Sequence, residues 1–167
     1  INKDGTSSQE LGKYIDNRQR APDWSSDGRS IYFTVQERGS IKLYRILLSN
    51  IQKPELIIDG PGRVRAWDTS QNNFITYIFH GPKDMAQVYL KRGRTITQLT
   101  DLNIGLLKER KIANVDSFTF LSFDGVQVEA FLTHPISKRV GSTHPLIVMI
   151  KGGPHGQQGP TLYHKAQ

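Results

Sequence analysis

The stretch that decides the fold is "WSSDGRSIYFTVQERGSIKLYRI", residues 24–46. It begins with a polar turn around Gly28 and continues into the apolar run "SIYFTV" (30–35). A second turn at Gly39 leads into "IKLYRI" (41–46). Ile, Val, Tyr and Phe dominate both runs, and these residues favour strands. The stretch therefore predicts a β-hairpin preceded by a tight turn.

The same layout recurs in "DTSQNNFITYIFHGPKDMAQVYLKR", residues 68–92, with strand signals in "FITYIF" (74–79) and "AQVYL" (86–90). Three pairs of identical residues are each 45 positions apart: Ser25 and Ser70, Tyr32 and Tyr77, and Tyr44 and Tyr89. Gly28 can adopt a positive φ, and the residue at the matching place, Asn73, is the next best choice for it. This period falls in the roughly 40–50 residue range of propeller blades.

We therefore expect about two blades of a β-propeller over residues 21–105. Two blades do not close a ring, because each blade buries its faces on its neighbours. The sequence thus resembles the end of a propeller whose earlier blades are missing. An unrelated antiparallel β domain with a chance repeat is the alternative. Helix signals are weak, and the best candidate is the unassigned segment 1–20.

The pattern changes after residue 105. "LNIGLLKERKIANV" (102–115) interrupts the repeat, and we expect a linker over residues 106–115. "DSFTFLS" (116–122) and "VQVEAFLTHP" (126–135) then flank Asp124-Gly125. Asp-Gly between alternating strands is a strong hairpin signal.

The run "PLIVMI" (145–150) is apolar without interruption, which is typical of a strand buried on both faces of a largely parallel sheet. A hairpin, a polar loop, a buried strand and a glycine turn form the order in which an α/β-hydrolase sheet begins. The expected fold is therefore β-rich, with the last blades of a β-propeller followed by the first strands of an incomplete α/β-hydrolase domain over residues 116–167.

The amino-acid composition argues against two classes of binding partner, nucleic acids and membranes. The 22 Lys and Arg exceed the 15 Asp and Glu, but the positive residues are scattered, so we expect a solvated surface and no nucleic-acid partner. No stretch approaches the roughly 18 apolar residues of a membrane span, so we expect no membrane partner. Cysteine is absent, which removes thiolate chemistry and leaves the compartment undetermined. The first residues are polar and lack an initiator Met, so export of a longer parent stays open.

Three motifs resemble the prolyl-oligopeptidase-type serine peptidases. "SSDGRSIYF" (25–33) is similar to their S-P-D-G-K-x-I-x-F blade motif. "SFDGVQVEAFLTHP" (122–135) and "HPLIVMIKGGPHGQQGP" (144–160) resemble the entry into their catalytic domain. The nearest branch contains the acylaminoacyl-peptidase and dipeptidyl-aminopeptidase-like enzymes. The resemblance covers nearly the whole chain from about Ala21.

This resemblance implies a hydrolase of peptide bonds in small peptides, with a Ser-Asp-His triad, a propeller that restricts access, and no metal or organic cofactor. "KGGPHG" corresponds to the oxyanion loop, where a fixed backbone N–H stabilises the negative charge of acyl transfer. Family correspondence assigns the donor to Gly153, with Gly152 in support, since Pro154 has no N–H. Lys151, where the family usually has His, and His155 are expected to support the loop together with Pro154. A simple strand-exit turn is the alternative.

The 167 residues contain no G-x-S-x-G motif. In α/β-hydrolases the nucleophile, the acid and the histidine follow the oxyanion loop in that order. We therefore expect the triad downstream, and this chain to be an internal fragment that is inactive alone and self-associates through unpaired strand edges. None of the five histidines stands in a metal-ligating spacing, so we expect no metal site. A non-catalytic β-rich module that binds a peptide or protein, and a truncated gene product without function, remain the competing interpretations.

Overall fold

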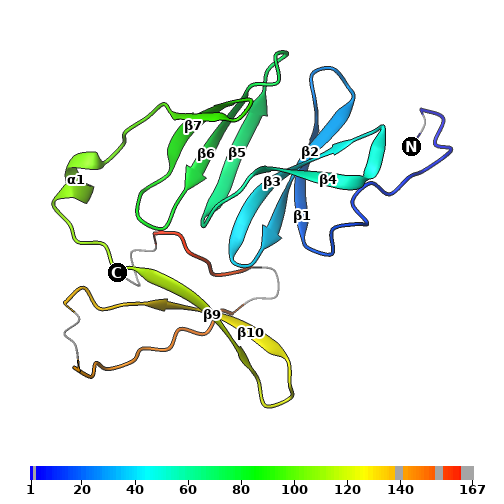
Figure 1. The fold of residues 1–167 in the computed structure, drawn as a ribbon. Helices are drawn as coiled ribbons and strands as arrows, with labels where there is room; N and C mark the ends of the chain where they lie inside the picture. The colour runs from blue at the N-terminus through cyan, green and yellow to red at the C-terminus, as the bar shows by residue number, and fades with distance from the viewer. Residues whose placement is uncertain (2, 138–140, 153–155, 163–167) are drawn as a thin grey trace.

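The computed structural model describes residues 1, 3–137, 141–152 and 156–162. This part of the chain contains an eight-stranded sheet, a two-stranded sheet and a short helix between them (Figure 1). The expectation of a β-rich fold is therefore confirmed. Within the described ranges, no helix has the length and apolar character that a membrane span requires.

The first half of the large sheet is one antiparallel unit of four consecutive strands: β1 (Gln19–Trp24), β2 (Ser30–Glu37), β3 (Ser40–Leu47) and β4 (Asn50–Ile58). Glu37 pairs with Ser40, so the β2–β3 hairpin has a two-residue turn. The central residues of this turn, Arg38 and Gly39, have φ of 44° and 71°. Two positive φ values give the turn a twist that matches that of the flanking strands. The predicted first hairpin is thus confirmed.

The second half is another antiparallel unit of four strands: β5 (Arg63–Thr69), β6 (Ile75–His80), β7 (Gln87–Arg92) and β8 (Thr95–Gln98). β6 and β7 confirm the two strands predicted from the repeat. The units meet where Ile41 of β3 pairs in parallel with Arg63 of β5. The Ile41 N–H also donates to the Gly62 carbonyl over 3.0 Å.

The turns that precede β2 and β6 share one conformation, as the repeat predicts. Gly28 has φ of 65° and its N–H donates to the Ser25 carbonyl at 2.9 Å. Asn73 has φ of 56° and its N–H donates to the Ser70 carbonyl at 3.0 Å. Asparagine tolerates the left-handed region better than most residues, which explains how it stands in for glycine.

The repeated tyrosines lie in the core that joins the two units. One cluster of buried side chains combines residues of β2 to β6: Tyr32, Leu43, Ile58, Val64, Ile75 and Tyr77. The rings of Tyr32 and Trp67 stand 5.6 Å apart across the units. A second cluster lies on the other face of the first unit, because successive side chains of a strand point to opposite faces.

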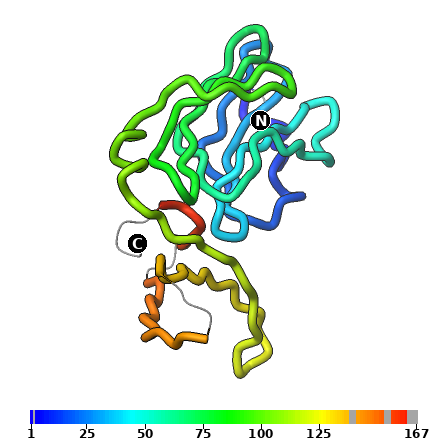
Figure 2. The backbone as a smooth tube through the Cα atoms, turned by 60° about the vertical axis from the view of Figure 1, so that its left-hand side comes forward, coloured from blue at the N-terminus to red at the C-terminus, as the bar shows by residue number. Residues whose placement is uncertain are grey.

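The second sheet is the hairpin of β9 (Val115–Leu121) and β10 (Gln127–Thr133). Gly125 has φ of 80°, and its N–H donates to the Ser122 carbonyl at 2.9 Å. The hairpin predicted from Asp124-Gly125 is therefore confirmed. Figure 2 shows this hairpin extending away from the large sheet, with the segment near the C-terminus between them.

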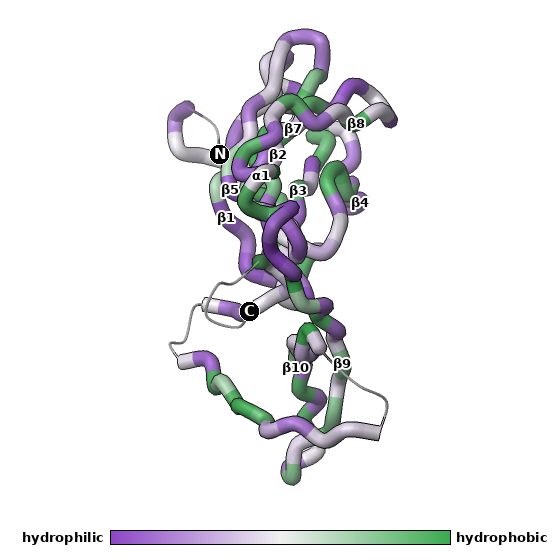
Figure 3. The backbone as a smooth tube through the Cα atoms, turned by 90° about the vertical axis from the view of Figure 1, so that its left-hand side faces the viewer, coloured by the Kyte–Doolittle hydropathy of each residue, from purple (hydrophilic) through white to green (hydrophobic). Residues whose placement is uncertain are grey.

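The buried strand predicted at 145–150 is wrong for this chain. No strand is assigned there, and the side chains are exposed, from 51% for Met149 to 92% for Ile150. Figure 3 shows the stretch as a continuous hydrophobic segment outside both sheets. A buried strand needs a hydrogen-bonded neighbour and elements that cover its faces, and neither β9 nor β10 pairs with this segment.

The weak helix candidate before residue 20 is also wrong. The described residues 1 and 3–18 form turns and irregular chain, and Leu11 and Ile15 pack against the second buried cluster. Among the described residues, the structure has one helix, α1 (Ile104–Lys108), which lies in the stretch 102–115 expected as a connection. Apolar contact with the sheet therefore orders the N-terminal segment without a helical repeat of hydrogen bonds.

Candidate functional site

The segment that follows the glycine turn runs along one end of the large sheet. Residues 156–162 lie between the sheet and the β9–β10 hairpin (Figure 2). The Leu162 N–H donates to the Gly81 carbonyl at 2.9 Å. A Cβ added at Gly159 would meet the Gly39 carbonyl oxygen, so two glycines allow the backbones to touch. The predicted loop is therefore joined to the sheet through the residues that follow it.

Gln157 connects this segment to two strands. Its side-chain Nε2 donates to the Ser40 carbonyl at 2.8 Å, and its own carbonyl accepts from Arg63 Nη2 at 2.6 Å. The Gly62 N–H donates to Ser40 Oγ at 3.4 Å, which ties the two strand ends to each other. Gln157 therefore uses both its side chain and its main chain to contact β3 and β5.

Arg63 is a half-buried cation at this junction. Burial, and then the nearby Arg65 guanidinium, lower the pKa of Arg63. Its Nε is buried and has no hydrogen-bond partner within the described residues. A buried guanidinium without a carboxylate partner is unfavourable unless its hydrogen bonds are well made. The 2.6 Å bond to the Gln157 carbonyl therefore offsets part of the cost of its burial.

The structure places part of the predicted oxyanion loop. Lys151 Nζ donates to the Gly152 carbonyl. The same Nζ lies 3.0 Å from the position a Cβ would occupy on Gly156, so the Lys151 side chain reaches Gly156. Gly152 is exposed, with nothing within 4 Å of an added Cβ. Gly153, Pro154 and His155 lie outside the described residues.

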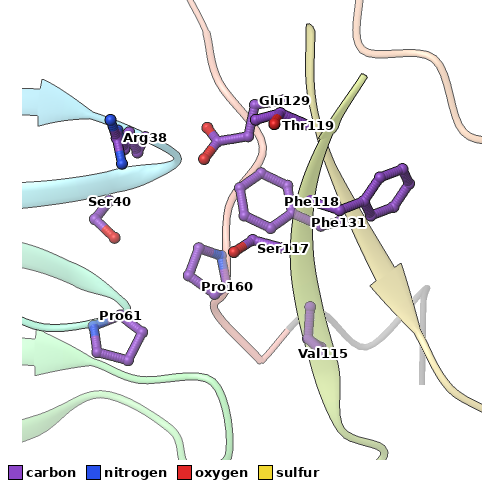
Figure 4. A pocket seen from close by; sticks show the side chains of 10 residues that line it. All are labelled: Arg38, Ser40, Pro61, Val115, Ser117, Phe118, Thr119, Glu129, Phe131 and Pro160. Atoms are coloured by element: carbon purple, nitrogen blue, oxygen red, sulfur yellow. The ribbon is translucent and has the colours of Figure 1, made fainter.

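A cavity of about 380 Å³ opens between the β2–β3 turn and the second sheet (Figure 4). It is lined by Arg38, Ser40, Pro61, Val115, Ser117, Phe118, Thr119, Glu129, Phe131 and Pro160. The Phe131 ring reaches Gly39, where an added Cβ would clash with it. Figure 4 shows Arg38 and Glu129 on opposite sides of the cavity. One wall is thus supplied by the sheet and the other by the hairpin.

A second hollow, of about 600 Å³, lies beside the first residues of the hairpin. It is lined by Pro82, Lys83, Ala113, Asn114, Val115, Asp116, His134, Pro135 and Ile136. His134 Nε2 and Asp116 Oδ2 are 2.6 Å apart, so this pair joins the start of β9 to the end of β10. The pair lies within the hairpin and is not hydrogen-bonded to Lys151 or Gly152, the predicted loop residues that the structure describes.

The sequence interpretation missed Gln157 and Arg63 as contacts of the loop. Both contacts join residues far apart in sequence, by 117 and 94 positions, and no local pattern encodes such pairs. The glycines of this segment predicted part of the arrangement. Gly159 followed by Pro160 marks a turn, but its close approach to Gly39 depends on the folded sheet.

Comparison with known proteins shows which proteins this chain resembles. No family model matches the chain. A curated relative, the uncharacterized peptidase YuxL of Bacillus subtilis (strain 168), is 25% identical over 153 residues, which are 92% of this chain and 23% of that protein. The acylaminoacyl peptidase of Pyrococcus horikoshii has a TM-score of 0.79 at 25% identity, covering 94% of this chain and 24% of that one.

A further solved structure is an acylaminoacyl peptidase in complex with Z-Gly-Gly-Phe-chloromethyl ketone. It has a TM-score of 0.78 at 26% identity, over 92% of this chain and 23% of that one. The chain is similar to one segment of the acylaminoacyl peptidases. The resemblance to prolyl-oligopeptidase-type peptidases is thereby confirmed. This chain spans about a quarter of the length of the acylaminoacyl peptidases it matches.

Proposed function

We propose that the chain is part of a serine peptidase that hydrolyses peptide bonds of small peptides. Residues 21–105 form two blades of its β-propeller, residues 106–115 form the linker, and residues 116–167 begin its α/β-hydrolase domain. The observation that carries the proposal is the likeness to two acylaminoacyl peptidases at 25% and 26% identity over 94% and 92% of this chain.

The assignment of blades is supported by the division of the large sheet. Propeller blades are four-stranded antiparallel sheets arranged around a central axis. β1–β4 and β5–β8 are two such units, and the repeated turns at Gly28 and Asn73 have the same left-handed conformation. Side chains of both units share one buried cluster, as neighbouring blades do.

In the proposed reaction, a serine from the triad downstream of this chain attacks the substrate carbonyl. Negative charge then develops on the carbonyl oxygen, and the backbone N–H of Gly153 stabilises it. Gly152 supports this donor by leaving space for the substrate, because an added Cβ there meets nothing within 4 Å. Lys151, Pro154 and His155 hold the shape of the loop. The acid and the base of the triad also lie downstream, and no metal or organic cofactor takes part.

The test is to express the gene with the reading frame that follows Gln167 and to supply an N-acetyl-aminoacyl anilide and a fluorophosphonate probe. We expect hydrolysis and labelling of one serine in a G-x-S-x-G motif beyond residue 167, and no labelling of residues 1–167 alone. Stoichiometric labelling of a serine within residues 1–167 would contradict the assignment. An inactive, unlabelled longer protein would favour the binding module instead.

A further inference from the structure

The contacts of residues 156–162 gather at three turns of the large sheet. Ser40 follows the β2–β3 turn, Arg63 begins β5 after Gly62, and Gly81 follows β6. Each of these turns makes a hydrogen bond to the segment, at 2.8, 2.6 and 2.9 Å respectively. The segment is therefore held at its start by two bonds and at its end by one.

These contacts differ from ordinary surface packing. Gln157 is partly buried, and its two bonds approach β3 and β5 from its side chain and its main chain at once. Gly159 touches the main chain of Gly39, which leaves no room for a side chain on either residue. Every one of these contacts involves a main-chain atom of at least one partner. The contacts therefore keep the segment from sliding along the sheet and from separating from it.

We propose that Gln157 and Arg63 are positioning residues that set the proposed oxyanion loop against the propeller-like sheet. This inference rests on the proposed function. The two residues, with the Ser40 carbonyl, form a clamp that fixes the point at which the chain leaves the loop after Gly156. Lys151 restrains the other side of the loop through the Gly152 carbonyl. The sheet thereby acts on the geometry of the reaction without contacting the reacting atoms.

The physical reason is the required precision of the site. Groups that stabilise a transition state must be held within about 0.5 Å of their productive positions by surrounding hydrogen bonds and packing. Gly152 and Gly156, the glycines of the loop that the structure describes, have no side chain with which to pack, so contacts of neighbouring residues must hold them in place. Misplacement of about 1 Å by a remote mutation can lower a rate by about a hundredfold.

The first experiment compares Gln157→Met with Gln158→Met. Both changes replace an amide with an unbranched apolar side chain of similar length, but only Gln157 contacts the Ser40 carbonyl, whereas Gln158 is exposed. In residues 1–167 we expect about fivefold faster amide exchange over 156–162 for Gln157→Met, as for the loss of one hydrogen bond. Gln158→Met should leave the exchange unchanged. Equal exchange in both variants would overturn the clamp.

The second experiment measures kinetics in the longer protein. We expect Gln157→Met to lower kcat about tenfold with KM and the melting temperature nearly unchanged, because binding groups stay intact while the donor shifts. Arg63→Met should have the same effect, and Arg63→Lys, which keeps a cationic donor, should retain more of kcat than Arg63→Met. If both Arg63 variants melt at a lower temperature and also have a raised KM, the residue is merely structural and the inference fails.

The two arms separate this inference from the proposed function. If the longer wild-type protein shows no hydrolysis, the proposed function fails while amide exchange still reports whether the clamp exists. If the longer protein is active and Gln157→Met and Arg63→Met keep the wild-type kcat, the proposed function stands and the positioning role is wrong.

Discussion

Gly39 and Gly159 meet backbone to backbone: a Cβ added to Gly159 would collide with the Gly39 carbonyl oxygen. One glycine belongs to the β2–β3 turn and the other to the segment after the predicted oxyanion loop. We expect Gly159→Ala to detach residues 156–162 from the sheet, because overpacking costs about 1–3 kcal/mol. Subtilisin should then cleave this segment roughly tenfold faster or more. Gly152→Ala is the control, since its added methyl meets open space; equal cleavage of both variants would refute the contact.

Arg38 has a backbone φ of 44°, which residues other than glycine and asparagine rarely adopt. Arg38→Asn should therefore raise the free energy of unfolding by about 1 kcal/mol, as left-handed strain of roughly this size is relieved. Chemical denaturation provides the measurement. Arg94→Asn is the matched control. Arg94 is also exposed and also lies in a hairpin turn, between β7 and β8, but its φ is not positive. A gain in both variants would point to net charge rather than to backbone strain.

His80 predicts a loss of stability under mildly acidic conditions. Burial, followed by the positive charge of Arg65, lowers the pKa of His80 from its ordinary value of 6.5. The unfolded chain thus binds a proton at a pH where the folded chain does not, so stability is full above about pH 6.5 and falls below it. Melting temperatures between about pH 7 and 5 test this window. His80→Gln should flatten the profile, and a melting temperature of the wild type that stays constant across this window would contradict the prediction.

The exposed apolar stretch 145–150 predicts self-association of residues 1–167. Ile147 and Ile150 are 85% and 92% exposed. An unpaired apolar segment with strand-forming residues templates pairing with other chains. Sedimentation velocity should show oligomers, and the double variant Ile147→Lys/Ile150→Lys should shift the distribution toward monomer. Double substitution of the exposed polar pair Gln71→Lys/Asn72→Lys controls for added charge. A monodisperse wild-type monomer would contradict the prediction.

Gly153→Pro in the longer protein tests the proposed donor. Proline lacks the N–H, and losing one oxyanion donor costs about 2.7–4 kcal/mol of transition-state stabilisation. We expect kcat to fall by about two to three orders of magnitude, with less effect on KM. Circular dichroism and the melting temperature must match wild type, and Gly152→Ala controls for crowding. A folded Gly153→Pro enzyme with normal kcat would make the loop a structural turn.

The local hairpins could be predicted from sequence, whereas the edge strands could not. β2, β3, β6 and β7 carry dense strand formers between turn residues, and this signal is independent of tertiary structure. β1 and β4 contain Pro22 and Pro54, which argue against a central strand. The structure places β1 and β4 at edges of the sheet. An edge strand pairs on one side only, so the N–H that proline lacks costs fewer hydrogen bonds there than in a central strand. Their existence depends on pairing with β2 and β3.

The sequence predicted the candidate site as a local motif but not the contacts that hold it. "KGGPHG" identified the loop, but its anchors at Ser40 and Arg63 belong to another part of the chain. The apolar run 145–150 shows the opposite case. Its local signal for a buried strand is strong, yet burial requires neighbouring strands, and the described hairpin β9–β10 does not supply them. Local composition sets what a segment favours, and its partners decide whether that preference is realised.

The seam between β3 and β5 has an evolutionary consequence. The two four-stranded units are joined in the ladder at Ile41 and Arg63, while each unit is fully paired within itself. Most of what holds them together is the shared cluster of side chains around Tyr32 and Tyr77. Duplication or deletion of one 45-residue unit at this seam therefore disturbs few main-chain bonds. Duplication can therefore lengthen such an array, and deletion can shorten it, while the hairpins of the remaining units stay unchanged.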